Sequence, residues 1–270
     1  MALLEIADLN VEAEGKNILK GVSLSVNSGD CVALLGPNGH GKSTLLNAIS
    51  GNPRYHVSNG TMHFEGSDVL SLSPDARSKA GIFMAFQNPP DVPGVVSMDF
   101  FRAAINARVA KPISLLSFYK ETTAAYQKVD LDSSMASRHL NEGYSGGEKK
   151  RNEVLQMLLL KPKLALLDEI DSGLDVDALK IIAQAINELK AAGTTFLIIS
   201  HYERLYELVH PNRTAVMVNG RIALEGDSAL ATRISTEGYG FLEKENGIVI
   251  EKEDSVPVSI GVCAVKPTLK

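Results

Sequence analysis

The chain has 270 residues with 27 lysines and arginines against 32 aspartates and glutamates, a formal net charge of −5. This acidic balance argues against a general nucleic-acid binder, since such proteins carry a basic face for the phosphate backbone. The one dense basic run, Lys149, Lys150 and Arg151, is interpreted as a solvated helix face. The longest apolar runs, at 154–160 and 194–200, are far shorter than the roughly 20 residues that cross a bilayer. We therefore expect neither a nucleic-acid partner nor direct membrane insertion.

The N-terminus and the cysteine content indicate a cytoplasmic protein. The first ten residues show no basic stretch followed by an apolar one, the pattern of a secretory signal. The two cysteines, Cys31 and Cys263, lie far apart without Cys-x-x-Cys spacing, which is typical of a reduced protein without a disulfide framework. Cys31 opens an apolar run and is expected in the core, whereas Cys263 lies in the C-terminal tail and is assigned no role.

Strands and helices alternate along most of the chain, and this order predicts an α/β fold built on a parallel sheet. Residues 1–30 alternate in polarity as strands do and end in a turn at 27–30. Continuous apolar runs predict strands buried on both faces at 31–36, 81–86, 163–169 and 194–200. Helices are expected at 42–50 and 176–192, and a shorter alternating strand at 61–66.

Three segments depart from this alternation. From about 88 to 158 the chain is mainly helical and is interrupted by four prolines, which predicts a helical insertion. Asn219-Gly220, between two apolar runs, predicts a hairpin with a type I′ turn. The last 27 residues, from Lys244, show no helical period and are treated as an extension of unknown role.

The residues between the first buried strand and the first helix form a phosphate-binding motif. They match G-x-x-x-x-G-K-[ST] in the strand–loop–helix context that the motif requires. Its glycines let backbone N–H groups turn inward, and the helix N-terminus adds the positive end of its dipole. Its lysine neutralises the β- and γ-phosphates, and the next hydroxyl binds Mg²⁺. The candidate nucleotide-binding residues are Gly36, Pro37, Asn38, Gly39, His40, Gly41, Lys42, Ser43 and Thr44.

An acidic pair closes the strand predicted at 163–169. Asp168, at the strand end beside the phosphate loop, is placed to hold Mg²⁺ together with Ser43. Glu169 follows directly, where a carboxylate can orient and deprotonate an attacking water, an effect usually worth about 10²–10⁴ in rate. The two motifs together predict a nucleoside triphosphatase.

A third motif narrows this prediction. Within 144–156, Ser145, Gly146 and Gly147 open a helix and create a second anion-binding helix terminus, which would serve a nucleotide held by another subunit. The segment resembles the signature sequence of ATP-binding cassette (ABC) ATPases, with Glu148 where many members have glutamine. Further matches in the expected order are Gln87, Ser172-Gly173-Leu174-Asp175 and His201.

The resemblance to ABC ATPases covers residues 1 to about 243 and implies an ATPase domain of that family. A P-loop, RecA-like core with a parallel sheet would span 1–87 and 159–243 and carry an antiparallel β subdomain. An inserted helical subdomain would span about 88–158, and 244–270 would be a C-terminal extension. The family uses ATP and Mg²⁺, and two copies join head to tail around two ATP molecules.

The same resemblance implies a role for each matching residue. Ser145 and Gly147 would contact the γ-phosphate of the ATP held by the other copy, and Asp175 would work at the seam between the copies. Gln87 would position Mg²⁺ and water, and His201 would sense the γ-phosphate. With Glu169, these two residues form the predicted catalytic set.

Longer segments narrow the resemblance to one branch, the SufC family of soluble ATPases in SUF iron–sulfur cluster assembly. These segments are GIFMAFQNPPDVPGV at 81–95, YSGGEKKRNEVLQM at 144–157, LLDEIDSGLDVDALK at 166–180 and HYERLYELVHPNRTAVMVNGRIALEGD at 201–227. Unlike most transporter cassettes, the chain has Asp171 before Ser172 and Gly173 in place of alanine. The resemblance implies SufB- and SufD-like scaffold partners that dock near Gln87 and the helical insertion, and a transient ATP-dependent self-dimer.

The sequence departs from the family pattern at two places, and it leaves two other functions to be considered. His40 replaces a smaller residue, and its imidazole would approach the phosphates or point to solvent. No aromatic residue near position 13 can stack on adenine, which implies weak base discrimination. The main alternative is the nucleotide-binding subunit of an ABC membrane transporter. A nucleic-acid-associated ABC protein would need a basic surface or inserted arms, which the sequence lacks.

Overall fold

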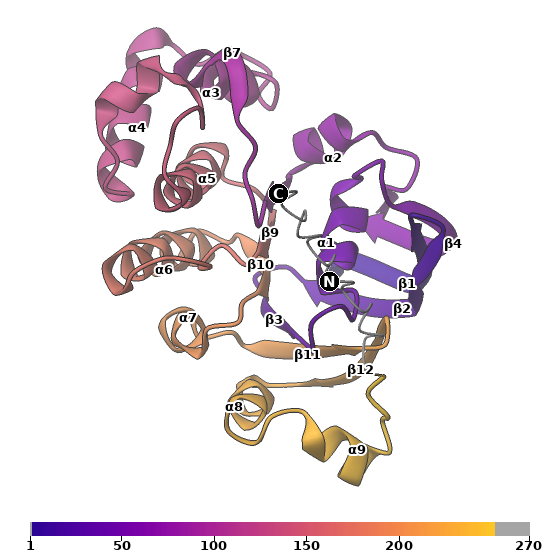
Figure 1. Ribbon diagram of the computed structural model, residues 1–270. Coiled ribbons are helices and arrows are strands. Elements are labelled where there is room, and N and C mark those ends of the chain that lie inside the picture. Colours follow the sequence, from indigo (N-terminus) through magenta and orange to yellow (C-terminus); the bar gives the residue numbers. More distant parts are fainter. Residues whose placement is uncertain (1, 252–270) are drawn as a thin grey trace, which may run out of the picture.

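Two sheets form the framework of the structure, a computed structural model that describes residues 2–251 (Figure 1). The larger sheet has the strand order β12 (Arg221–Gly226), β11 (Arg213–Val218), β3 (Cys31–Leu35), β10 (Thr195–Ile199), β9 (Leu164–Asp168) and β6 (Ile82–Ala85). All neighbouring strands in it are parallel except β11 and β12. The predicted parallel sheet is therefore confirmed.

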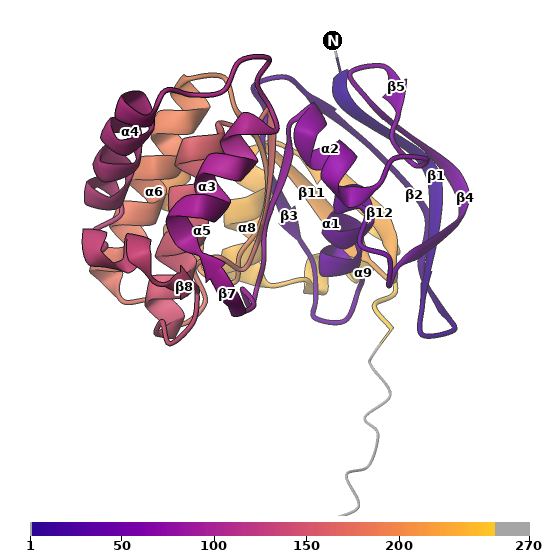
Figure 2. The same cartoon turned by 90° about the horizontal axis from the view of Figure 1, so that it is seen from above.

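The second sheet is antiparallel, with the strand order β2 (Lys16–Asn27), β1 (Ala2–Ala13), β4 (His56–Phe64) and β5 (Ser67–Asp68). Helix α1 (Lys42–Ser50) lies between the two sheets and contacts both (Figure 2). Its two ends are those predicted from the sequence. The strand expected at 61–66 is the second half of β4, which begins earlier than the polarity pattern indicated.

The central strands are apolar throughout because both of their faces are covered. Side chains alternate between the two faces of a strand. In β9, Leu164 and Leu166 join the core on the α1 side, whereas Ala165 and Leu167 join the core on the other side. All residues of β3, β9 and β10 are buried, and Cys31 lies in the core as expected.

Most helices pack on the face of the larger sheet that is turned away from α1 (Figure 1). They are α3 (Ser97–Asn106), α4 (Leu115–Lys128), the 3-10 turn η1 (Ser133–Ser137), α5 (Gly146–Leu160), α6 (Val176–Ala191), α7 (Glu203–Val209), α8 (Ser228–Glu237) and α9 (Gly240–Asn246). The remaining helix, α2 (Pro74–Ala80), contacts α1 and β6. The helix expected at 176–192 is α6, one residue shorter than predicted.

The insertion is not wholly helical. Strands β7 (Val92–Val96) and β8 (His139–Leu140) pair antiparallel and form a small third sheet. The sequence predicted a break between helices at Pro93, which is confirmed, but it did not predict that the break forms strand β7. Val92 pairs with Leu140 and Val96 with His139, so Pro93 lies between the paired positions and no ladder hydrogen bond is required from it.

The predicted type I′ hairpin joins β11 to β12. Asn219 and Gly220 both have positive φ, 51° and 76°, as this turn requires. After α9 the chain returns to the turn, where Asn219 binds the backbone of Val249 and Glu251. Residues 252–270, which include Cys263, lie outside the described part of the chain. Within residues 2–251, no helix is both long and apolar enough to span a bilayer.

A buried arginine connects α2 to the C-terminal end of α1. The guanidinium of Arg77 is 5% exposed and donates to the carbonyls of Ala48 and Ile49 at 2.8 and 3.0 Å. It also donates to the carbonyls of Leu70 and Leu72. Two of these bonds reach carbonyls in the last turn of α1, where the helix itself supplies few donors, and the other two reach the loop before α2.

We expect Arg77→Met to keep the apolar contacts of the side chain but to remove these four hydrogen bonds. The free energy of unfolding should fall by about 3 kcal/mol, measured by urea denaturation. Arg204→Met, at an exposed position, serves as the matched control and should change it by less than about 0.5 kcal/mol. Equal losses in the two variants would contradict the role of Arg77.

Candidate active site

Four parallel strands end at one edge of the larger sheet, and the segments that follow them line a cavity of about 530 Å³. The phosphate loop follows β3, Gln87 follows β6, Glu169 follows β9 and His201 follows β10. This edge, at the carboxyl ends of the strands, is where α/β sheets bind ligands. The lining residues are Ile18, Asn38, Gly39, Gly41, Lys42, Ser43, Thr44, Gln87, Glu169 and His201.

Glycine is required at two positions of the phosphate loop. Gly36 has φ 149°, and a Cβ atom there would lie 2.1 Å from the carbonyl oxygen of Met217. Gly41 has φ 100°, and a Cβ atom there would lie 2.7 Å from Leu19 Cδ2. The loop is therefore packed against β11 and β2 so closely that only glycine fits, which holds its backbone in one conformation.

Lys42 lies inside the phosphate loop. Its ammonium donates to the carbonyls of Gly36 and Pro37 at 2.7 and 2.9 Å, and the residue is only 7% exposed. Burial lowers the pKa of Lys42, while the carboxylates of Glu169 and Asp168 act in the opposite direction. These contacts hold the cation where the loop would receive phosphate groups.

Oxygen groups beside Lys42 fit a magnesium ion. Ser43 Oγ donates to Asp168 Oδ1 at 2.9 Å. Asp168 is 3% exposed, and burial raises its pKa although the bond from Ser43 acts to lower it. A hydroxyl, a carboxylate and the amide oxygen of Gln87 are hard oxygen ligands of the kind that Mg²⁺ prefers. The donor set therefore suits this ion.

The carboxylate of Glu169 is held from two sides. Gln87 Nε2 donates to Glu169 Oε2 at 2.6 Å, and His201 Nε2 lies 3.0 Å from Glu169 Oε1. The backbone of Glu169 has φ 47°, and its N–H donates to the carbonyl of Ile199 in β10. Segments 82 and 32 residues away along the chain thus fix one carboxylate in the cavity. A carboxylate so placed can accept a proton from water.

Lys150, which was expected on a solvated helix face, is buried beneath the cavity. Lys150 in α5 is 5% exposed and donates to the carbonyls of Phe86, Gln87 and Glu169. The interpretation of 149–151 as a solvated helix face is therefore wrong for Lys150, although its two neighbours form ion pairs with aspartates. Burial lowers the pKa of Lys150. One lysine fixes the backbone of the Gln87 segment and of Glu169 together.

A buried carboxylate lies one helical turn further along α5. Glu153 is 5% exposed, and its Oε2 accepts from the backbone N–H of Phe86 at 3.1 Å. Its Oε1 accepts from Gln156 Nε2, and burial raises its pKa to about 7. The i, i+3 spacing of Lys150 and Glu153, which places opposite charges on one side of the helix, is the sequence signal that could have identified this pair.

Asp171 links the segments that follow β9 and β10. It is 2% exposed and accepts a hydrogen bond from Ser200 Oγ, and burial raises its pKa. Ser200 directly precedes His201. Asp171 therefore helps to hold the histidine that approaches Glu169.

Part of the predicted site lies elsewhere. Among the predicted residues that do not line the cavity, Gly36, Pro37, His40 and Asp168 belong to the phosphate loop or to the strand end beside it, whereas Ser145, Gly146, Gly147 and Asp175 lie on other segments. Ser145 caps α5 in a capping box, accepting from the N–H of Glu148 at 3.3 Å while its own N–H donates to Glu148 Oε2 at 2.7 Å. Asp175 caps α6 by accepting from the N–H of Ala178.

The structure contradicts one of the two alternatives for the His40 side chain, the one in which it points to solvent. His40 is 8% exposed, so it does not point to solvent, and it does not line the cavity. Instead its Nδ1 accepts from the backbone N–H of Asn219 at 2.8 Å. The aliphatic Ile18 lines the cavity, consistent with the absence of an aromatic residue near position 13.

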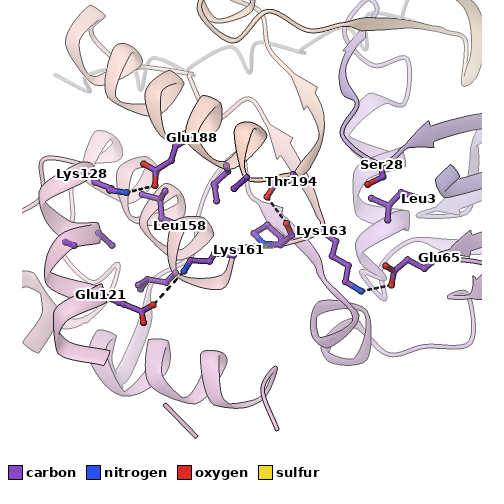
Figure 3. Close-up of a pocket in the computed structure, with 17 residues that line it drawn as sticks. Leu3, Ser28, Glu65, Glu121, Lys128, Leu158, Lys161, Lys163, Glu188 and Thr194 are labelled. Atoms are coloured by element: carbon purple, nitrogen blue, oxygen red, sulfur yellow. Dashed lines mark hydrogen bonds and ion pairs between the residues drawn. The ribbon is translucent and has the colours of Figure 1, made fainter. Parts of the chain in front are cut away.

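A second cavity, of about 480 Å³, lies at the opposite edge of the sheet, where β9 and β10 begin (Figure 3). Its three lysines are each paired with a glutamate, Lys128 with Glu188, Lys161 with Glu121 and Lys163 with Glu65. Because these charges balance, the cavity offers no net positive charge to phosphate groups. The nucleotide is therefore assigned to the first cavity.

Comparison with known families identifies the chain. Residues 19–172 match the family described as ABC transporter. The chain belongs to this family of ATPases. It binds and hydrolyses ATP, and the fold predicted from the sequence, a P-loop α/β core with an antiparallel β subdomain and a helical insertion, is that of ABC cassettes.

The sequences of individual relatives align with nearly the whole length of this ABC ATPase. A "probable ABC transporter ATP-binding protein" of Streptococcus pyogenes is 48% identical, covering 94% of the chain and all of the relative. "Vegetative protein 296" of Bacillus subtilis is 47% identical, covering 91% of the chain and 95% of the relative. A solved ATP-binding subunit of an ABC transporter superposes with a TM-score of 0.74 at 25% identity, covering 88% and 95% of the two chains. The dimeric cassette MJ0796 bound to ADP and Pi, with a TM-score of 0.72 over 83% and 98% of the two chains, is 21% identical and supports the fold alone.

The buried Glu153 gives this ABC ATPase a specific pH dependence. Its pKa is raised from 4.5 to about 7 in the folded chain, so the folded state binds the proton more tightly. The contribution of Glu153 to folding therefore becomes more favourable as pH falls from 7 towards 4.5, and the charged form reduces stability above pH 7.

Glu153→Gln keeps an acceptor for Phe86 and has no charge. We expect its free energy of unfolding to exceed that of the wild type by up to about 3 kcal/mol at pH 8, with the difference shrinking towards pH 5. Urea denaturation at pH 8, 6.5 and 5 measures this. Glu207→Gln, at an exposed position, should show a constant difference, and the same constancy in Glu153→Gln would refute the prediction.

Proposed function

We propose that this chain is the cytoplasmic ATPase subunit of a SUF-type iron–sulfur cluster assembly complex, in which ATP-driven joining of two copies moves a SufB- and SufD-like scaffold. One observation carries the proposal. Lys150 and Asp171, from two of the segments with the SufC-family resemblance, are buried on the two sides of Glu169 and hold the Gln87 and His201 segments. Residues from two of the segments with the SufC-family resemblance thus hold the backbone that carries the candidate catalytic carboxylate and its two partners.

In the proposed reaction Glu169 accepts the proton of the water that attacks the γ-phosphate. Gln87 and His201 hold its carboxylate, at 2.6 and 3.0 Å, so that its position does not depend on a flexible side chain. Lys42 and the loop N–H groups neutralise phosphate charge. Ser43, Asp168 and Gln87 would hold Mg²⁺, which supplies further charge neutralisation when bound.

Two copies are required because one chain lacks part of the site. The helix terminus at Ser145–Gly147 and the cap residue Asp175 lie outside the cavity that holds the phosphate loop. In a head-to-tail pair, the Ser145 terminus of one copy faces the γ-phosphate of the ATP in the other. ATP then acts as the ligand that favours the closed pair.

The scaffold is proposed to dock in an apolar groove beside Gln87. A cavity of about 490 Å³ lies between α2 and α3, and its lining includes Met84, Phe86 and Phe100. Phe86 is 40% exposed, although the backbone on both of its sides is held by Lys150 and Glu153. A partner that moves Phe86 therefore acts on the backbone of Gln87, which touches Glu169.

A second candidate is the nucleotide-binding subunit of a membrane transporter. It is favoured by the names of several relatives, including the "probable ATP-dependent transporter ycf16" of Cyanophora paradoxa, 43% identical over 90% of this chain and 95% of that relative. The ATP site would work in the same way, and the groove would receive a segment of a permease. The partner therefore distinguishes the two functions.

We expect Glu169→Gln to bind Mg-ATP but to hydrolyse it about 10²–10⁴ times more slowly than the wild type, because the proton acceptor is lost. The variant should form a dimer with saturating Mg-ATP, detected by light scattering. Glu203→Gln, at an exposed position, is the matched control and should hydrolyse ATP at the wild-type rate. A Glu169→Gln chain that stays monomeric with saturating Mg-ATP would contradict ATP-driven pairing of the isolated chain.

Affinity capture of the tagged chain from a lysate of its source cells tests the partner. We expect soluble SufB- and SufD-like proteins, and recovery of a permease in their place would overturn the SUF assignment. Phe86→Asp should reduce capture about ten-fold or more, because it places a charge in the groove. Leu116→Asp changes an 82%-exposed residue outside the groove and should capture the scaffold as well as the wild type does.

A further inference from the structure

The phosphate loop is held at two points, Gly36 and His40, by residues that follow β11 in the chain. At the first residue of the loop, the N–H of Gly36 donates to Tyr239 Oη at 2.9 Å. Further along the loop, His40 Nδ1 accepts from the N–H of Asn219 at 2.8 Å, and the carbonyl of His40 accepts from the N–H of Gly220 at 3.1 Å. None of these contacts was indicated by the phosphate-binding motif itself.

Asn219 also binds the last residues that the structure describes. Its Nδ2 donates to the carbonyl of Val249 at 2.7 Å, and its Oδ1 accepts from the N–H of Glu251 at 3.1 Å. The backbone of Asn219 thus contacts the phosphate loop while its side chain contacts the segment 248–251. One residue joins the two.

The same part of the chain packs on the strand that leads into the loop. Helices α8 and α9 lie beside β11 and β12 (Figure 1). Phe241 and Leu242 of α9 are buried against Leu35, the last residue of β3, and Ile248 and Ile250 pack on the same cluster. We call residues 228–251, together with the turn Asn219-Gly220, the C-terminal clamp.

The C-terminal clamp affects nucleotide affinity because the phosphate loop is rich in glycine. Glycines with positive φ have many alternative conformations, so a glycine-rich loop loses much entropy when it binds phosphates in a single one. Contacts that hold the loop before the ligand arrives reduce this cost and increase affinity. Tyr239 and Asn219 contact the loop from outside the nucleotide cavity, of whose lining neither is a part.

We propose that Tyr239 and Asn219 are positioning residues for the phosphate loop and that docking of 248–251 on Asn219 increases the affinity of the loop for ATP. Coupling of this kind is reciprocal, so ATP tightens the docking of 248–251 by the same factor. Any event that displaces this segment then weakens ATP binding by the same factor. The inference concerns ATP binding alone and holds for a scaffold partner and for a permease partner.

Tyr239→Phe removes one hydroxyl and keeps the ring. We expect the Kd of a fluorescent ATP analogue with Mg²⁺ to rise about three- to ten-fold, the effect of one hydrogen bond, with kcat at saturating ATP unchanged. Tyr119→Phe removes a hydroxyl from an exposed tyrosine of α4 and is the matched control, with wild-type Kd and kcat.

Asn219→Gly keeps the backbone turn and deletes the contacts to 248–251. Glu65→Gly is its matched control, because Glu65 also has φ 51° and also precedes a glycine in a hairpin turn. We expect the Kd for the nucleotide to rise three- to ten-fold in Asn219→Gly and to stay unchanged in Glu65→Gly.

Hydrogen exchange reports the reciprocal effect. In the wild type, Mg-ATP should slow exchange of the Glu251 amide, which is bonded to Asn219, and in Asn219→Gly this protection should disappear. Melting temperatures of the ligand-free variants distinguish a purely structural role of these residues from a role in ATP binding. Variants with lower melting temperatures but wild-type Kd values would overturn the proposal, as would exchange at Glu251 that does not respond to ATP.

Discussion

Parallel strands present their carboxyl ends at one edge of a sheet, and the whole candidate site depends on that constraint. The strands β3, β6, β9 and β10 are neighbours in the larger sheet, although the insertion separates β6 from β9 by nearly eighty residues. Because of the shared direction, the loop after each strand enters the same cavity. Glu169 needs no long flexible connection to meet Gln87 and His201, since neighbouring strands bring all three there.

Two buried charged residues beneath this edge of the sheet, Lys150 and Glu153, hold the connecting segments in place. Burying a lysine and a glutamate is costly, and a well-packed apolar pair is often more stable. In this chain Lys150 and Glu153 use that burial to bind the carbonyls of Phe86, Gln87 and Glu169 and the N–H of Phe86. The pair satisfies backbone groups of two connecting segments that form no strand or helix there. As a consequence, the backbone at Phe86 in the groove is rigidly coupled to the segment that carries Glu169.

Local pattern was sufficient for the features that depend on local chemistry. The buried strands follow from apolar runs, and the ends of α1 and the turn at Asn219 lie at glycines, so the sequence predicted all of them. The partners of Lys150 and His40 lie 19 to 64 and 179 residues away, so their burial depends on the fold and not on neighbouring residues. Strand β7 was missed for a similar reason, because its partner β8 is distant and its own residues include a proline and a glycine.

The capping box of α5 opposes closure of two isolated chains in the proposed sandwich. The N–H of Ser145 donates to Glu148 and lowers the pKa of that carboxyl, which is therefore ionised at neutral pH. This charge stabilises the N-terminus of the free helix, but it repels the γ-phosphate that the same terminus would meet. A glutamine would make the same capping contact without the charge. Both copies also carry a net charge of −5, so ATP binding has to overcome this repulsion in the isolated chain, and a scaffold that raises the effective concentration of the copies would favour closure further.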